Sequence, residues 1–143
     1  MSDQTDKQVT ETTSESNDGG ENSEVLKKVL ENHWGYDRFL PLQFEAMGAV
    51  LNDLDSLVIF PTGGSKSLCY QAPAVASGEL GIVVSPLISL MKDQVDSLRS
   101  IGVQAAYLNS TLTGEQENEV LEQVTNQSLK FLYVALENLF ANH

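Results

Sequence analysis

The sequence predicts an α/β fold: a parallel sheet with helices on both faces. Four short apolar runs are expected to be strands: "SLVIF" (56–60), "GIVVS" (81–85), "VQAAYL" (103–108) and "KFLYV" (130–134). The runs are nearly continuous rather than alternating, which indicates strands buried on both faces, as in a parallel sheet. Helical stretches separate the runs, so we expect right-handed crossovers between the strands.

The first 23 residues are expected to form a disordered acidic tail. They are rich in Ser, Thr, Asp, Glu and Gly and contain almost no apolar residues. Such a segment cannot bury enough surface to offset the entropy lost on ordering. The tail is either a plain solvated leader or a site of regulatory modification. Residues 24–143 then form the ordered domain.

Helices are expected between the tail and the first strand and after each strand. The stretch 24–35 has one apolar stripe and ends at a glycine; the stripe comprises Val25, Leu26, Val29, Leu30 and His33 or Trp34. A second helix follows Pro41. Further helices are predicted over 66–76, 87–100 and 113–126. In the stretch 87–100 the expected core residues are Leu87, Leu90, Met91 and Val95.

Composition excludes several classes of protein. No apolar run approaches the roughly 20 residues that a membrane span needs. The one cysteine, Cys69, cannot form an internal disulfide, so we expect a buried thiol and an intracellular setting, cytoplasmic in a bacterium or nuclear in a eukaryote. The net charge of −12 argues against a protein that grips DNA by charge alone.

The stretch "PTGGSKS", 61–67, follows a predicted strand and opens a predicted helix, the arrangement of a phosphate-binding loop. The backbone there can approach a phosphate closely at Gly63 and Gly64. The Lys66 ammonium can neutralise β- and γ-phosphate charge, the Ser67 hydroxyl can ligate Mg²⁺, and Thr62 can cap the helix or contact phosphate.

The strict pattern G-x-x-x-x-G-K-[ST] is not met, because Phe60 and Ser65 occupy its two glycine positions. An ordinary Gly-rich turn with a solvated lysine therefore remains an alternative.

Four segments together resemble the RecQ family of ATP-dependent DNA helicases: "GYDRFLPLQ", "PTGGSKSLCYQ", "VVSPLISLMKDQVDSL" and "YLNSTL". The resemblance spans about residues 25–140. It implies a helicase of two RecA-like lobes that moves 3′ to 5′ on single-stranded DNA with ATP and Mg²⁺. Residues 24–143 would be part of the first lobe, without the DExH box, the second lobe and its arginine finger.

The resemblance also implies roles for individual residues. Tyr36 matches an aromatic that stacks near the adenine, and Gln43 matches a glutamine that reads its edge; otherwise Tyr36 covers the core and Gln43 faces solvent. The motif "SPLISLMKDQ" would contact the DNA backbone through Ser85, Ser89 and Lys92.

A loop along the DNA path is matched by Asn109, Ser110 and Thr111. The same three residues are also expected to form an Asx-type turn that caps the next helix.

The chain departs from the family at four places that bear on function. These are Ser65 for a glycine, Leu40 for an arginine, Asp53-Leu54 for Gly-Arg, and Leu136-Glu137-Asn138 for Pro-Glu-Arg. A non-glycine residue at a strained position costs on the order of 1–3 kcal/mol. We therefore expect ATP binding to be weakened by roughly ten- to several-hundred-fold.

Three hypotheses follow: the N-terminal part of a RecQ-type helicase, a non-catalytic remnant that binds nucleotide or DNA weakly, and a small nucleotide kinase. The kinase would need arginines in a lid, and only Arg38 and Arg99 exist. Because the sheet would lack further strands, we expect the isolated chain to aggregate or to fold only partly.

Overall fold

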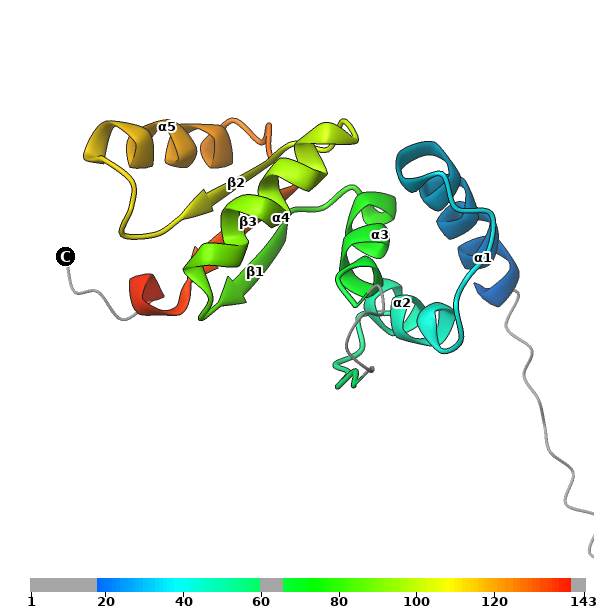
Figure 1. Ribbon diagram of the computed structural model, residues 1–143. Helices are drawn as coiled ribbons and strands as arrows, with labels where there is room; N and C mark the ends of the chain where they lie inside the picture. Colours follow the sequence, from blue (N-terminus) through cyan, green and yellow to red (C-terminus); the bar gives the residue numbers. More distant parts are fainter. Residues whose placement is uncertain (1–17, 60–65, 140–143) are drawn as a thin grey trace, which may run out of the picture.

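The structure, a computed structural model, describes residues 18–59 and 66–139. A group of helices lies beside a small parallel sheet (Figure 1). In chain order the elements are α1 (Asp18–Val29), the π-helix η1 (Leu30–Trp34), α2 (Gln43–Leu51), α3 (Leu68–Ser77), β1 (Gly81–Ser85), α4 (Ile88–Ser100), β2 (Ala105–Leu108), α5 (Gly114–Thr125), β3 (Phe131–Ala135) and the 3₁₀ helix η2 (Leu136–Leu139).

The sheet has three parallel strands in the order β1-β3-β2, with helices on both faces, as the sequence predicted. On one face α4 packs on the sheet through Met91, Val95 and Leu98. On the other face α5 contributes Val120 and Val124, which pack near residues of β2 and β3. The central strand β3 is buried along its whole length.

The helix α4 buries fewer leucines than its sequence predicted. Met91, Val95 and Leu98 recur every three or four residues and face the sheet. The expectation that Leu87 and Leu90 are core residues was wrong, because both are about half exposed. Leu87 precedes the helix, and Leu90 is directly before Met91 and so lies off the buried stripe.

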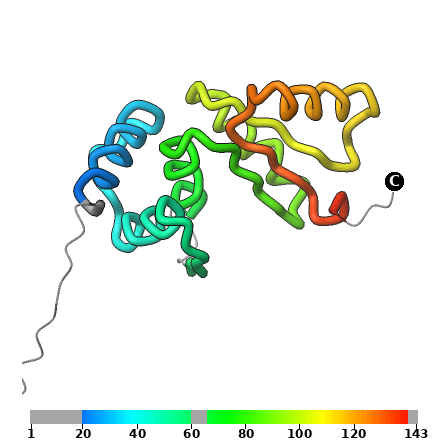
Figure 2. Tube along the Cα trace, turned by 180° about the vertical axis from the view of Figure 1, so that it is seen from behind, coloured from blue at the N-terminus to red at the C-terminus, as the bar shows by residue number. Residues whose placement is uncertain are grey.

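The helix α3 joins the helical group to the sheet (Figure 2). Its residues Leu68 and Ala72 belong to a buried cluster with Leu26, Leu30 and Met47. Other residues of the same helix, Tyr70, Ala74 and Val75, pack against the cluster beneath α4. The helix is therefore covered on both sides by apolar side chains.

The first helix begins inside the predicted tail. Of the expected tail 1–23, residues 1–17 lie outside the described residues, and α1 starts at Asp18 rather than at residue 24. Acidic side chains near a helix N-terminus interact favourably with its dipole, and Glu21 is so placed. The helical stretch ends at Gly35, as predicted, with a φ of 73°.

The first predicted strand is wrong over residues 56–59, which are neither helix nor strand; Phe60 lies outside the described residues. Leu57 is 88% exposed and Ile59 is 81% exposed. A strand needs a neighbour for its backbone N–H and C=O groups, and none of the described strands pairs with this segment. Its apolar sequence is typical of a buried strand, but no strand in the described part of the chain pairs with it.

The edge strand β1 is buried on only one face, against the prediction. Ile82 pairs with Leu132, and Val84 pairs with Val134, so these side chains share the face covered by α5. The helix does not reach β1, and Ile82 is 62% exposed. The remaining elements agree with the predicted ranges to within a few residues, and β1 agrees fully.

A close approach at the start of β1 requires a glycine. A Cβ atom on Gly81 would lie 2.8 Å from two ring carbons of Phe131. The Phe131 ring is fully buried and packs edge-on against Tyr70 at a centroid distance of 6.4 Å. It has little room to move aside.

We predict that Gly81→Ala lowers the free energy of unfolding by about 1–3 kcal/mol, because the added methyl overpacks the Phe131 site. Chemical denaturation measures the change. Gly48→Ala is the matched control: a Cβ there meets nothing within 4 Å, and alanine in a helix is favoured by up to about 1 kcal/mol. Equal effects of the two substitutions would contradict the close-packing argument.

Candidate nucleotide pocket and DNA-facing edge

A pocket of about 640 Å³ opens at the start of α3. Its described lining comes from α2, the segment before the phosphate loop, α3 and α4, and comprises Ala46, Val50, Ser56, Val58, Lys66, Ser67, Cys69, Tyr70 and Gln94. The volume lies within the range usual for small-molecule sites. Of the predicted nucleotide residues, the structure brings Lys66 and Ser67 together here.

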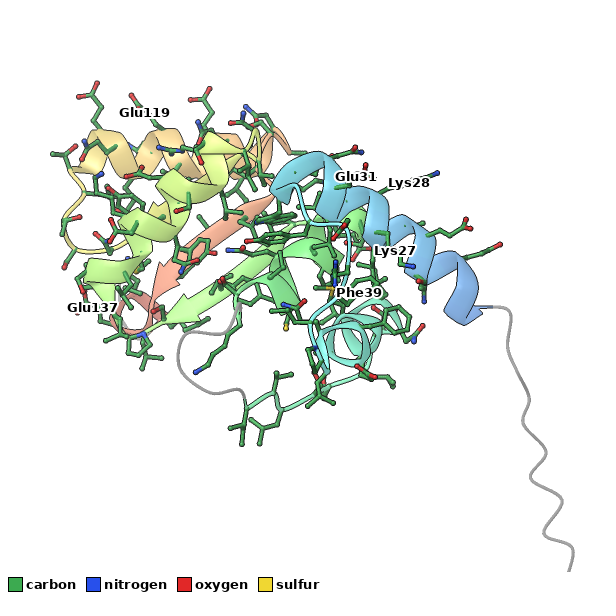
Figure 3. All side chains as sticks on the ribbon, turned by 45° about the vertical axis from the view of Figure 1, so that its right-hand side comes forward. Lys27, Lys28, Glu31, Phe39, Glu119 and Glu137 are labelled. Atoms are coloured by element: carbon green, nitrogen blue, oxygen red, sulfur yellow. The ribbon has the colours of Figure 1, made fainter. Side chains whose placement is uncertain are left out.

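The described lining of this pocket suits an anion. It contains one cation, Lys66, and no carboxylate, although the chain has 20 acidic and only 8 basic residues. Other charges lie on outer surfaces: Figure 3 shows Glu119 on the outer side of α5 and Lys28 projecting from α1. The local charge is therefore opposite in sign to that of the whole chain.

The helix α3 starts where its N–H groups can serve the pocket. Ser67 precedes the helix, and its side chain makes no capping hydrogen bond. The first N–H groups of a helix have no partner within the helix and carry a partial positive charge. Thr62, Gly63, Gly64 and Ser65 lie outside the described residues, so their predicted phosphate contacts remain predictions.

The structure contains one candidate magnesium ligand in this pocket. No three His, Cys, Asp or Glu side chains among residues 18–59 and 66–139 come together to hold a metal ion. The Ser67 hydroxyl beside Lys66 fits a Mg²⁺ ion that takes its other ligands from phosphate oxygens and water.

The buried side chains of the pocket wall are neutral. Burial raises the pKa of the Cys69 thiol, which keeps it protonated and weakly nucleophilic. Burial and the hydrogen bond with Tyr133 raise the pKa of Tyr70 well above its usual value. No motif in the sequence marks Tyr70 and Gln94 as lining residues of the pocket. Only their position in the fold identifies them as such.

The two predicted adenine contacts do not line this pocket. Tyr36 is exposed, and its backbone N–H donates to the Leu30 carbonyl at 3.2 Å. Gln43 is only 3% exposed, and its Oε1 accepts a hydrogen bond of 2.8 Å from the Leu40 N–H. The alternative that Gln43 faces solvent was therefore wrong; its side chain fixes the turn that leads into α2.

One departure from the family has a visible backbone consequence. Asp53 has a φ of 56°, which is a left-handed conformation that glycine adopts without strain. The resemblance implied a glycine at this position. Aspartate tolerates the conformation better than most residues, so the turn after α2 keeps its shape.

The predicted DNA contacts gather at the carboxyl edge of the sheet. Ser85 ends β1, and Asn109 follows β2, on either side of β3. Strands in a sheet lie about 4.8 Å apart, which places these two positions roughly 10 Å apart. The Ser85 hydroxyl accepts a hydrogen bond of 3.1 Å from the Leu87 N–H, while Ser89 is exposed near the start of α4.

The loop after β2 is an Asx-type turn, as predicted. Asn109 is buried, and its Oδ1 accepts hydrogen bonds from the Thr111 N–H, at 2.9 Å, and from the Thr111 hydroxyl. Ser110 and Thr111 are exposed. The expectation that this turn caps the next helix was wrong, because Thr113 caps α5 in a capping box with Gln116.

The predicted DNA contact Lys92 has an intramolecular partner. Its ammonium donates to the Asp96 carboxylate at 2.6 Å, and both side chains are exposed. This hydrogen bond raises the pKa of Lys92. A phosphate would compete with Asp96 for the same charge.

The model of the DEAD/DEAH box helicase family matches residues 40–143. The chain belongs to the RecQ family of DEAD/DEAH box helicases. Among its relatives is an "ATP-dependent DNA helicase RecQ" of Haemophilus influenzae, 47% identical over 84% of this chain and 20% of the relative.

Two further relatives are also named as ATP-dependent DNA helicases. An "ATP-dependent DNA helicase RecQ" of Pasteurella multocida is 48% identical over 78% of this chain and 18% of its own length. A "Putative ATP-dependent DNA helicase Q1" of Caenorhabditis elegans is 44% identical over 85% of this chain and 20% of its own length. The chain thus spans about one fifth of the length of these relatives. No helix in the described ranges is long and apolar enough to span a bilayer.

We predict that Gln43→Ala lowers the stability of the chain by about 1 kcal/mol without any nucleotide present, because the Leu40 N–H loses its acceptor. Thermal unfolding of the variant and of the wild type measures the change.

The control is Gln123→Ala on the exposed side of α5, expected within about 0.5 kcal/mol of the wild type. If Gln43→Ala is as stable as that control, the turn does not depend on the Gln43 side chain.

Proposed function

We propose that the chain is the N-terminal ATP-binding portion of a RecQ-like ATP-dependent 3′–5′ DNA helicase, and that it binds ATP with Mg²⁺ at the Lys66 pocket and contacts single-stranded DNA. One observation supports this most: a pocket with Lys66 as its described cation and no described carboxylate, in a strongly acidic chain. The names of the relatives point to the same activity.

Each residue has a separate role in binding ATP and Mg²⁺. The Lys66 ammonium neutralises phosphate charge, and the Ser67 hydroxyl ligates Mg²⁺ together with phosphate oxygens. Residues 62–65 would supply backbone N–H groups. For Tyr36 to stack near the base and Gln43 to read it, as the resemblance implies, the base has to extend beyond the described lining of the pocket. Bound Mg²⁺ supplies charge that offsets the triphosphate. These roles make the pocket a binding site for a nucleoside triphosphate.

DNA would bind along the carboxyl edge of the sheet. Ser85, Ser89, Lys92 and the turn Asn109–Thr111 present hydroxyl, amide and ammonium groups suited to backbone phosphates. The overall negative charge leaves little non-specific affinity, so binding depends on these local groups. A protein with this role works in the compartment that contains DNA.

A non-catalytic remnant is the second candidate function. Ser65, Leu40, Asp53-Leu54 and Leu136-Glu137-Asn138 depart from the family at functional places. In this case the chain binds nucleotide or DNA weakly and does not turn over. ATP hydrolysis stimulated by DNA in the isolated chain would exclude the remnant.

We predict that Ser65→Gly tightens binding of a fluorescent ATP analogue with Mg²⁺ by about ten- to a hundred-fold, because it removes a Cβ from the phosphate loop. Lys66→Ala should abolish measurable binding. Fluorescence titration measures both. Lys28→Ala, which removes the same charge from the outer side of α1, should change little. Equal binding by Lys66→Ala and Lys28→Ala would refute the proposed pocket.

We predict that Asp96→Asn increases affinity for a single-stranded oligonucleotide several-fold at low salt, because Lys92 loses its intramolecular partner. Asp93→Asn makes the same change in net charge on an exposed neighbour that forms no salt bridge with Lys92 in the described structure, and it should have a smaller effect. Fluorescence anisotropy measures both affinities. An equal gain in oligonucleotide affinity for the two variants would contradict the proposed contact between Lys92 and DNA.

A further inference from the structure

Four polar side chains meet where α3, α4 and β3 come together. Gln71 donates from its amide to the Gln94 Oε1, at 3.2 Å, and to the Tyr133 hydroxyl, at 3.1 Å. The Tyr133 hydroxyl also hydrogen-bonds the Tyr70 hydroxyl at 2.9 Å. This group, Tyr70, Gln71, Gln94 and Tyr133, is called the polar junction below.

Each of the four side chains of the polar junction takes part in at least one hydrogen bond with another of them. The two amide hydrogens of Gln71 reach two acceptors, and the Tyr133 oxygen serves both Gln71 and Tyr70. Among the described residues, no buried side-chain nitrogen or oxygen lacks a hydrogen-bond partner. Because an unsatisfied buried group is costly, these side chains can move only together.

The surroundings of the polar junction are rigid. Tyr133 is 2% exposed and belongs to the apolar cluster with Met91 and Val95 of α4. Gln71 is also buried. Packed interiors of this kind change between discrete arrangements rather than by continuous deformation.

The polar junction lines one proposed site and includes a residue of the helix that carries part of the other. Tyr70 and Gln94 line the pocket that contains Lys66. The Gln71 N–H donates to the Ser67 carbonyl at 3.0 Å, one helical turn away. On the other side, Gln94 belongs to α4, the helix that carries Ser89 and Lys92. A shift of α3 on nucleotide binding would therefore act directly on α4.

We propose that Gln71 and Tyr133 are positioning residues that couple nucleotide binding in the Lys66 pocket to DNA binding on α4. The inference rests on the proposed function, because it needs both ligands to bind. Coupling between two sites is reciprocal: each ligand changes the affinity for the other by the same factor, commonly about 5- to 150-fold. A purely structural role would alter stability and leave that factor unchanged.

The test uses the full 143-residue chain. The dissociation constant of a fluorescent ATP analogue with Mg²⁺ is measured with and without a saturating single-stranded oligonucleotide. For the wild type we expect the two constants to differ at least about fivefold. Tyr133→Phe removes only the central hydroxyl. It should bring the ratio to about one, with the affinity for each ligand alone within about twofold of the wild type.

Two further variants complete the experiment. Gln71→Met removes both hydrogen-bond donations but keeps a side chain of similar length, and it should also bring the ratio to about one. If Tyr133→Phe does not fold, Gln71→Met tests the coupling in its place. Tyr107→Phe is the matched control, since Tyr107 is half-buried in the same sheet and takes no part in the hydrogen bonds of the polar junction. It should keep the wild-type ratio.

The outcomes separate this inference from the proposed function. A wild-type chain that binds both ligands with a ratio of one, or a Tyr133→Phe variant that keeps the wild-type ratio, would overturn the coupling alone. A wild-type chain that binds neither ligand would overturn the proposed function and the coupling together. Thermal unfolding of each variant shows whether it is folded during the assay.

Discussion

The structure depends on the way α3 is held between two apolar clusters. One side of α3 packs with α1 and α2 through Leu68 and Ala72, and the other side packs on the sheet through Tyr70, Ala74 and Val75. Trp34 of η1 also packs against both clusters, so η1 adds to the contact that α3 makes between the helical group and the sheet. The buried hydrogen bonds of Gln71 then fix the helix in one rotation, because any other would leave its amide unpaired.

The position of the candidate site follows from the same constraint. A helix held in this way presents the two residues that precede it, Lys66 and Ser67, at a fixed place in a pocket that α2 and α4 also line. The helix α4 begins close to the carboxyl edge of the sheet, where Ser85 and Asn109 lie on either side of β3. In this RecQ-family chain one buried helix therefore connects the proposed nucleotide pocket to the proposed DNA-facing edge.

Much of the fold could be predicted because its signals are local. The apolar run of β1, the glycine that ends the first helical stretch and the Asx turn at Asn109 need only nearby residues to form. The strand at 56–60 failed over its described part for the opposite reason. Its apolar residues predict burial, but burial needs a neighbouring strand, and no described strand pairs with it. The exposure of Ile82 likewise depends on how far α5 reaches across the sheet.

The site was predictable only in part. Lys66 and Ser67 were found because a strand, a Gly-rich turn and a helix form a recognisable local pattern. The burial of Gln43 and the hydrogen bonds of the polar junction could not be predicted, because the sequence around a glutamine in a helix does not show which group its amide bonds. The left-handed backbone at Asp53 was indicated only through the resemblance to a family with glycine there.

The most direct measurement is native-state hydrogen exchange of the backbone amides in the chain without ligands. If α3 joins the two parts into one cooperative unit, amides of α2 and α3 should open with the same free energy as those of β1 and β3. A helical group that exchanges through its own low-energy opening, while the sheet stays protected, would contradict the account.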